Sequence, residues 1–431
     1  MLKIIKNFLT YSTGAVVLRL ITSTIAFTAI HFLTPTEYGL LALINTFIGI
    51  APIFLSLGLR QAYSLDFFHT DNVGRKKILN DIIIIYLIIS VPIFIIASLN
   101  LSIINKYIFL NQASPITLLL IFTICFIHFF TELLFQTLRY QSKAMHFTAT
   151  QIIMGTITAL TTFILVYFTK LKITGIVFGN LFGMLIIALY ALYLYTKKVG
   201  SLNLNTNKKQ ASYYLKLGLP FIPSIIFSWI LSFGDRWMLA RYATLHEVGI
   251  YSLADSFGIL FQMLILYPLS NSYIPHIFKM FSENKTKILE IDQWNKDNMY
   301  KCMTGMFIVV TIGFLVCQNI FYLIIPIKYH ESIKYIWLIL IGQIFFMGSY
   351  FATCYLQYFK KTYYLVGFTI FSSLLNTLLN IILIPRFSIY GCIIATTISY
   401  MAYLAIIIFV TNNVQQNTHV LEKLRTNIKS L

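Results

Sequence analysis

The chain alternates long apolar runs with short polar connections. Four of the runs contain no Asp, Glu, Lys or Arg: 82–99 (IIIIYLIISVPIFIIASL), 173–196, 335–359 and 362–385. Runs of this length are typical of transmembrane helices, which need about 17–25 residues. Reading each run against its polar flanks predicts twelve spans, near 8–31, 40–61, 78–99, 115–138, 147–169, 174–196, 214–241, 250–275, 302–325, 335–357, 363–384 and 391–411.

Composition supports an all-α polytopic membrane protein. Of the 431 residues, 58% are hydrophobic and 11% are charged, whereas a soluble domain has about 25% charged residues. The 32 Lys and Arg residues outnumber the 14 Asp and Glu residues, but they lie in connections between spans and not on one soluble face. We therefore expect no nucleic-acid partner.

The distribution of basic residues predicts the orientation. With both termini on the cytoplasmic side, the cytoplasmic segments carry 23 Lys and Arg residues and the external segments carry eight. Cytoplasmic loops of membrane proteins are enriched in these residues. We expect a multi-pass protein of the cell inner membrane with both termini in the cytoplasm. The connections are too short for a soluble catalytic domain, so the sequence predicts no enzyme and no catalytic residues.

An internal repeat predicts two six-helix lobes. A shift of 210 residues places Glu37-Tyr38-Gly39 on Glu247-Val248-Gly249, and a shift of 216 places the Gly175/Gly179/Gly183 ladder on Gly391/Ala395/Ser399. Small residues at every fourth position allow helices to approach closely in lipid. The predicted parts are an N-terminal lobe at 1–200, a cytoplasmic linker at 201–213, a C-terminal lobe at 214–411 and a cytoplasmic tail at 412–431. Two such lobes suit alternating access around a central site.

Arg19 is the most informative charge, because it lies about eleven residues into the first span, or roughly 16 Å deep at 1.5 Å per residue. A charge at this depth costs about 2.5–3.5 kcal/mol on insertion scales. Ser12 and Ser23 share its helical face. The pattern fits either a substrate-binding cation or an arginine that only holds the bundle together by pairing with a carboxylate.

Span four carries a second polar stripe, with His128, Glu132, Gln136 and Arg139 at spacings of four, four and three. This spacing predicts one continuous polar seam. Two roles for Glu132 fit equally well, namely neutralising Arg19 or taking up a proton during transport.

Further polar groups lie in the second half of the chain and at the mouth of span two. Arg60 fits either snorkelling or substrate capture. Either an external gate or a substrate site would explain Asp235, Arg236 and Asp255. Hydrogen bonds between helices explain Asn376 and Asn380. The five cysteines have unrelated spacings, so neither a metal site nor a disulfide framework is expected. The remaining candidate is Gln262.

Three passages carry a resemblance to a known family: LTPTEYGLLAL at 33–43, FGDRWMLARYATLHEVGIYSLADSF across spans seven and eight, and NTLLNIILIPRFSIYGCIIATTISY at 376–400. They resemble the Wzx-type polysaccharide flippases of the MOP superfamily, which also contains the MATE exporters and the lipid II flippases. The resemblance implies a MATE-like fold and transfer of an undecaprenyl-diphosphate-linked oligosaccharide, an O-antigen or capsule unit, to the periplasmic leaflet. It also implies polymerase and chain-length machinery as partners.

The resemblance gives roles to the candidate residues. A cationic cavity suits a diphosphate, because guanidinium groups bind phosphate strongly; Arg19, Arg60, Arg139 and Arg236 are the candidates. The candidates for ion coupling or gating are His128, Glu132, Asp235 and Asp255. The polar lining would be Ser12, Ser23, Gln136, Gln262, Asn376 and Asn380. No cofactor is expected beyond a coupling ion, H⁺ or Na⁺, since no ATP-binding motif is present.

Two alternatives remain open. The first is a MATE-like antiporter that exports cationic drugs. The second is a membrane O-antigen polymerase or ligase, although those enzymes usually need a large external loop, and the longest external connection here, near 100–114, carries only one charged residue, Lys106.

Overall fold

The computed structural model describes residues 2–199, 207–284 and 287–429, without the side chains of 2–13, 15–16, 72, 198–199 and 416–429. The described residues form helices and turns, with no strand among them. By their internal contacts they divide into two compact units, Met1–Ile226 and Phe227–Leu431. Each unit is described by itself.

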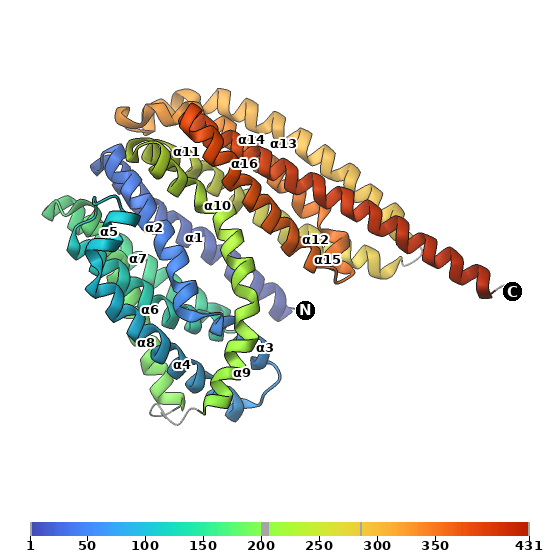
Figure 1. The fold of residues 1–431 in the computed structure, drawn as a ribbon, viewed down its shortest axis with the longest axis horizontal. Coiled ribbons are helices and arrows are strands. Elements are labelled where there is room, and N and C mark those ends of the chain that lie inside the picture. The colour runs from blue at the N-terminus through green and yellow to red at the C-terminus, as the bar shows by residue number, and fades with distance from the viewer. Residues whose placement is uncertain (1, 200–206, 285–286, 430–431) are drawn as a thin grey trace. The chain divides into compact units, whose positions relative to one another are not determined.

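The first unit contains the helices shown from blue to green in Figure 1. These are α1 (Leu2–Phe32), α2 (Pro35–Ser56), α3 (Leu59–Phe67), α4 (Asn72–Leu99), α5 (Leu101–Ile108), α6 (Pro115–Tyr140), α7 (Ala144–Thr169), α8 (Lys172–Val199), α9 (Lys208–Gly218), the short η1 (Leu219–Phe221) and the start of α10 (Ile222–Tyr242).

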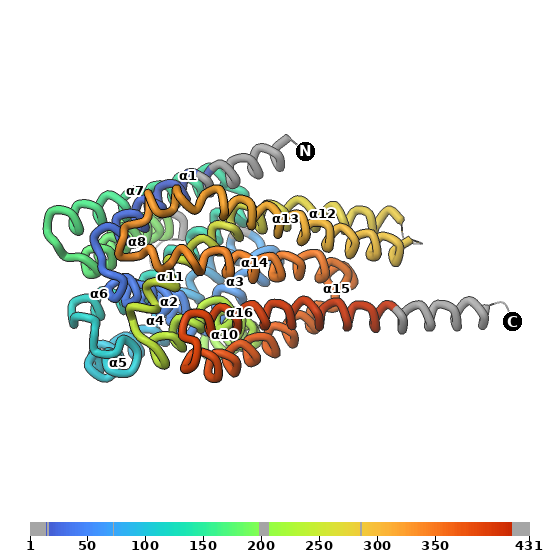
Figure 2. Tube along the Cα trace, turned by 90° about the horizontal axis from the view of Figure 1, so that it is seen from above, coloured from blue at the N-terminus to red at the C-terminus, as the bar shows by residue number. Residues whose placement is uncertain are grey.

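The second unit contains the rest of α10 and the helices shown from yellow-green to red. These are α11 (Leu245–Phe261), η2 (Gln262–Leu266), α12 (Tyr267–Glu283), α13 (Ile288–Ile324), η4 (Ile327–Ser332), α14 (Ile333–Ala352), α15 (Cys354–Tyr358) and α16 (Tyr363–Lys429). Within this unit α13 runs beside α12 and α14 (Figure 2).

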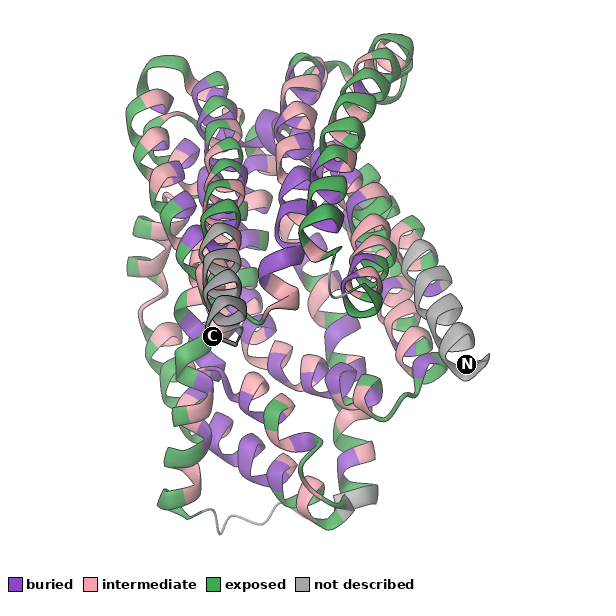
Figure 3. Cartoon of the chain, turned by 90° about the vertical axis from the view of Figure 1, so that its right-hand side faces the viewer, coloured by how far each residue is buried: buried purple, intermediate pink, exposed green. Residues whose placement is uncertain are grey.

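The twelve predicted spans are all present. Ten helical segments of the described chain are long and apolar enough to cross a membrane, and the apolar part of α1, Val17–Phe32, supplies the predicted first span. The last of the ten, Tyr363–Gln415, contains a non-helical residue at Ser388, which separates the predicted spans eleven and twelve. Buried and exposed residues alternate along the same helices (Figure 3), as expected where one face packs and the other meets lipid.

The predicted repeat is visible at two equivalent helix starts. Thr34 caps α2 and Thr244 caps α11, and each forms a capping box with the glutamate three residues later, Glu37 or Glu247. In such a box the threonine side chain accepts a hydrogen bond from the glutamate N–H, and the glutamate carboxylate accepts one from the threonine N–H. The turns that looked alike in sequence therefore start their helices in the same way.

A second pair of equivalent residues contacts the glutamates of the two capping boxes. Lys172, at the start of α8, has φ 44°, and Ser388, 216 positions later, has φ 48°. The Lys172 ammonium lies 2.6 Å from Oε1 of Glu37, and the Ser388 hydroxyl donates to Oε1 of Glu247. Both units therefore tie the start of their second predicted span to the start of their sixth, which supports a duplicated architecture.

The glycine ladder brings α8 against α7. A Cβ atom on Gly179 would lie 2.3 Å from Oγ1 of Thr162, and one on Gly183 would lie 2.1 Å from Oγ1 of Thr158. Only glycine allows this approach of the two helices. The ladder is therefore a packing surface and not a row of lipid-facing glycines.

Two span boundaries differ from the sequence expectation. Span two ends early, since Leu57 and Gly58 have φ 43° and 75° and the chain restarts as α3. A Cβ on Gly58 would lie 2.2 Å from the carbonyl oxygen of Gly218, so the end of α9 packs in the first unit. Span nine begins earlier than predicted, because α13 starts at Ile288.

Candidate functional site

The polar groups of the first unit centre on an ion pair between α3 and α6. Nη2 of Arg60 lies 2.9 Å from Oε2 of Glu132, with 30% and 28% of the two side chains exposed. The break at Gly58 creates α3 and so brings Arg60 to this position. Glu132 is thus paired with Arg60, whereas the sequence suggested Arg19 as its partner. The pair is accessible enough for either charge to meet a ligand.

A hydrogen-bonded cluster supports this pair. The Gln136 amide, one turn beyond Glu132, lies 3.1 Å from the Arg60 carbonyl oxygen, 2.8 Å from the Tyr140 hydroxyl and in contact with Ser64 Oγ. The Tyr140 hydroxyl in turn donates to Ser64 Oγ at 2.5 Å. These bonds hold α3 against the C-terminal end of α6 and fix the backbone that carries Arg60.

The seam on α6 departs from the prediction at its last member. Arg139 is exposed and its guanidinium lies over the Phe147 ring, 5.4 Å from the centroid. Tyr140, four residues after Gln136, takes the position expected for Arg139 and contacts Gln136, because residues four apart lie on the same face of a helix. His128 lies one turn before Glu132, half-buried, and interacts electrostatically with both Glu132 and Arg60.

Arg19 lies on α1 and is half-buried. Its Nε is buried and has no hydrogen-bond partner within the described part of the chain. Ser23 is exposed, and its hydroxyl donates to the Arg19 carbonyl oxygen at 2.8 Å, so it satisfies the backbone and not the guanidinium. The side chain of Ser12 lies outside the described residues. Arg19 thus keeps donor capacity for another group.

The second unit contains a buried charge cluster. Nη1 of Arg236 lies 3.1 Å from Oδ1 of Asp235, its Nη2 lies 2.5 Å from Oδ2 of Asp255, and 5%, 6% and 13% of the three side chains are exposed. Tyr251 donates a hydrogen bond to Oδ2 of Asp235. One guanidinium faces two carboxylates, so the cluster has an excess negative charge when all three groups are ionised. Arg236 is fully engaged by the protein, unlike Arg19.

The same cluster borders a cavity of about 310 Å³ inside the second unit. Asp235, Asp255 and Gln262 all line it, and the Gln262 amide donates to Gln343 on α14 at 2.8 Å. Gln262 opens the π-helical turn η2, a distortion that is frequent at functional sites. The sequence identified these three residues, and the fold gathers them around one polar space.

Asn376 forms the predicted hydrogen bond between two spans, whereas Asn380 bonds within its own span. The Asn376 amide donates to Thr396 across the Ser388 bend at 3.3 Å, and the Asn380 amide donates to Asn376 at 3.0 Å. Thr396 also lines the cavity.

Several polar residues were missed by the sequence reading. Ser64 and Tyr140 belong to the cluster of the first unit, and Tyr251 and Gln343 belong to that of the second. Each is a neutral residue, so no charge marked it in the sequence. A further buried ion pair joins Lys296 and Asp292 at 2.7 Å. The Lys296 ammonium also donates to Asn412 at 2.7 Å, so this lysine, predicted to lie in a cytoplasmic loop, holds α13 to α16.

The fold defines the class of protein. The chain is similar to an inward-facing multidrug-resistance MATE transporter of the MOP superfamily, with 16% identity, TM-score 0.72, and coverage of 94% of this chain and 96% of that one. It is also similar to the lipid II flippase MurJ in an inward closed conformation, with 14% identity, TM-score 0.75 and coverage of 95% and 87%. A third similar structure is a MOP superfamily transporter from Pyrococcus furiosus, with 12% identity, TM-score 0.60 and coverage of 94% and 95%. The fold is therefore that of MOP superfamily transporters.

The family follows from the sequence itself. The family model described as polysaccharide biosynthesis protein matches residues 4–281. No curated protein sequence matches the chain. The chain belongs to the polysaccharide biosynthesis protein family, and it is a multi-pass membrane protein with a MATE-like and MurJ-like fold.

Proposed function

We propose that this protein is a flippase that moves an undecaprenyl-diphosphate-linked oligosaccharide, an O-antigen or capsule repeat unit, from the cytoplasmic to the periplasmic leaflet. The observation that carries the proposal is family membership over residues 4–281 in a chain that keeps arginines within its apolar helices. The similar fold of a lipid II flippase supports a lipid-linked substrate. The orientation is the one that the basic residues predict.

The diphosphate is the part of this substrate that must cross the apolar core, and guanidinium groups suit it because they donate several hydrogen bonds in a fixed plane. Arg19 has a buried Nε that no described residue satisfies. Arg60 is held by the Gln136 cluster with 30% of its side chain exposed. These two residues are our candidates for direct contact with the diphosphate. Arg139 at the exposed end of α6 is a weaker candidate, and Arg236 acts through the carboxylates that surround it.

We also propose that a cation gradient, of H⁺ or Na⁺, drives the cycle. One charge moving through 100 mV supplies about 2.3 kcal/mol. The cavity beside Asp235 and Asp255 offers carboxylate, amide and hydroxyl oxygens with one negative charge in excess. In the first unit, His128 and Glu132 are the candidates for proton uptake, because a proton on Glu132 would break its ion pair and release Arg60.

A genetic complementation tests the substrate. Deletion of the gene in its host should abolish surface polysaccharide and leave lipid-linked units inside the cell. The wild-type gene should restore the polysaccharide, and an Arg19→Gln variant expressed at the same level should restore much less. Normal surface polysaccharide in the deletion strain would refute the proposed substrate.

A cation exporter is the second candidate, and one observation favours it. The cavity of the second unit is acidic, and the fold is similar to that of multidrug-resistance MATE transporters. This alternative predicts hypersensitivity of the deletion strain to cationic dyes with surface polysaccharide unchanged, so the same strain distinguishes the two functions.

A further inference from the structure

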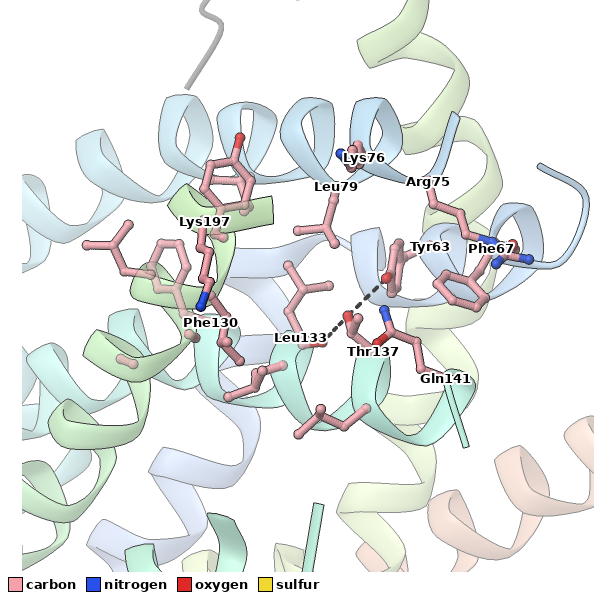
Figure 4. A pocket seen from close by; sticks show the side chains of 18 of the residues that line it. Tyr63, Phe67, Arg75, Lys76, Leu79, Phe130, Leu133, Thr137, Gln141 and Lys197 are labelled. Carbon is pink, nitrogen blue, oxygen red and sulfur yellow. Dashed lines mark hydrogen bonds between the residues drawn. The ribbon is translucent and has the colours of Figure 1, made fainter. Parts of the chain in front are cut away.

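A cavity of about 840 Å³ lies inside the first unit and has its own lining. Its walls come from α3, α4, α6 and α8 (Figure 4). Arg60, Glu132 and Gln136 do not line it. Its volume is within the range of about 300–1,000 Å³ that is usual for ligand sites. It therefore has the size of a separate binding site.

The cavity has an apolar body. Leu79, Ile83 and Leu87 from α4 face Phe130, Leu133 and Leu134 from α6 across it. Two further lining residues on α8, Leu189 and Leu192, have 56% and 51% of their surface exposed. A wall that is exposed in this way is open at the side of the unit. Because these exposed residues are leucines in a membrane-spanning helix, the opening suits lipid chains better than water.

One end of the cavity is basic. Arg75 and Lys76 come from the first turns of α4, and Lys197 comes from the end of α8. Figure 4 shows Lys197 on one side of the space, near Phe130, and Arg75 on the other, next to Phe67, with Lys76 on α4 between them. Lys76 and Lys197 are exposed, and no Asp or Glu is among the described residues that line the cavity. Lys76 and Lys197 therefore meet no carboxylate within the described lining.

Arg75 is held in place by the protein. Its Nε donates to the Phe67 carbonyl oxygen at 2.9 Å, and its guanidinium lies 4.5 Å from the centroid of the Phe67 ring. Thr137 and Gln141 from the C-terminal end of α6 add polar groups at the same end, and the Tyr63 hydroxyl lies 2.9 Å from Oγ1 of Thr137. The rim thus combines a positioned guanidinium with two mobile ammonium groups.

An anionic head on an apolar tail is the chemistry that fits this arrangement. Basic pockets between transmembrane helices on the cytoplasmic side are suited to phosphate headgroups of lipids. The basic end here is the N-terminal end of α4 and the C-terminal ends of α6 and α8, which the distribution of Lys and Arg predicts to be cytoplasmic. A glycan would need polar side chains along the cavity, and its body has none.

We propose that this cavity binds one anionic glycerophospholipid of the surrounding bilayer, with its anionic headgroup at the basic rim that includes Lys76 and Lys197 and an acyl chain between α4, α6 and α8. The bound lipid fills space that the side chains leave open and joins α4 to α8. It is a component of the folded first unit, independent of the substrate that the protein transports.

Lipid binding to the purified full-length protein tests this proposal. Native mass spectrometry in detergent would compare phosphatidylglycerol with phosphatidylcholine of the same acyl chains. We expect tighter binding of phosphatidylglycerol to the wild type, and a higher melting temperature with that lipid. Each removed cation should weaken this binding about fivefold, so that Lys76→Gln with Lys197→Gln weakens it roughly 25-fold.

Two further variants sharpen the test. Lys77→Gln removes an equally exposed lysine, next to Lys76 but outside the cavity, and should leave the preference unchanged. Ala191→Trp fills the cavity and should weaken both lipids. Equal binding of the two lipids to the wild type, or an equal loss in Lys77→Gln and Lys76→Gln, would overturn the proposal. Tight binding of undecaprenyl phosphate with none of phosphatidylglycerol would also overturn it, because the cavity would then belong to the substrate path.

Discussion

Arg60 and Glu132 form an ion pair of 2.9 Å between α3 and α6, at a point where the chain has broken span two to make a separate short helix. The pair is partly exposed, and Gln136 holds the Arg60 backbone from the next turn of α6. A partly exposed ion pair contributes about 1 kcal/mol or less to stability. The role we propose for the pair is therefore in transport more than in folding.

We expect Arg60→Gln and Glu132→Gln to fold almost as stably as the wild type and to lose most of the transport. Melting temperatures in detergent should change little, and surface polysaccharide in a complemented deletion strain should fall in both. The exchange variant, Arg60→Glu with Glu132→Arg, separates the roles. It restores the pair but moves the guanidinium, so transport should stay low if Arg60 itself meets the diphosphate.

The buried cluster of the second unit should behave differently. Arg236→Ala leaves Asp235 and Asp255 buried without their partner, and breaking a buried pair in this way costs about 3–5 kcal/mol. We expect a large drop in melting temperature and little folded protein. Arg241→Ala is the matched control, since Arg241 lies on the same helix and is exposed. Equal melting temperatures for the two variants would show that the cluster does not hold the unit together.

The two capping boxes allow a paired comparison. Glu37→Ala and Glu247→Ala each remove a cap and a contact to α8 or α16, and loss of a cap costs about 0.5–2 kcal/mol. Glutamine keeps the capping geometry, so Glu37→Gln should lie close to the wild type although it loses the charge facing Lys172. Thermal unfolding of the three variants measures this, and a Glu37→Gln variant as unstable as Glu37→Ala would assign the stability to the ion pair.

The helix contact at the glycine ladder makes a further prediction. A Cβ on Gly183 would lie 2.9 Å from the Met154 carbonyl oxygen as well as against Thr158. Gly183→Ala should therefore separate α7 from α8 and cost about 1–3 kcal/mol, as overpacking does. Gly313→Ala on α13 is the control, because its Cβ would meet nothing within 4 Å. That variant should be neutral or slightly more stable, since alanine favours the helix.

The spans and the repeat were predictable because they depend on local patterns. Apolar runs bounded by polar turns predicted every span, and the T-x-x-E sequence before each second span is a recognised helix start. Offsets of 210 and 216 residues identified the equivalent helix starts at Glu37 and Glu247. That Lys172 and Ser388 contact these two glutamates is visible only in the structure.

Long-range partners were not predictable. Glu132 pairs with Arg60 because the chain turns at Gly58. The sequence does not show this turn, and so Arg19 was the partner that the sequence suggested. Arg139 packs on the Phe147 ring and does not belong to the predicted seam. Lys296 is buried because α13 starts well before its apolar run. The lipid-sized cavity of the first unit has no sequence signature, since its cations lie at the start of α4 and at the end of α8, far apart in the sequence.

Movement of a lipid-linked oligosaccharide across a bilayer tests the central claim most directly. The purified protein would be placed in liposomes that carry undecaprenyl-diphosphate-linked glycan in the inner leaflet, and a glycan-cleaving enzyme outside would report its arrival in the outer leaflet. We predict rapid exposure of the glycan with the wild type and slow exposure with Arg60→Gln at equal incorporation. Exposure no faster than in liposomes without protein, together with uptake of a cationic dye, would contradict the account and favour a cation transporter.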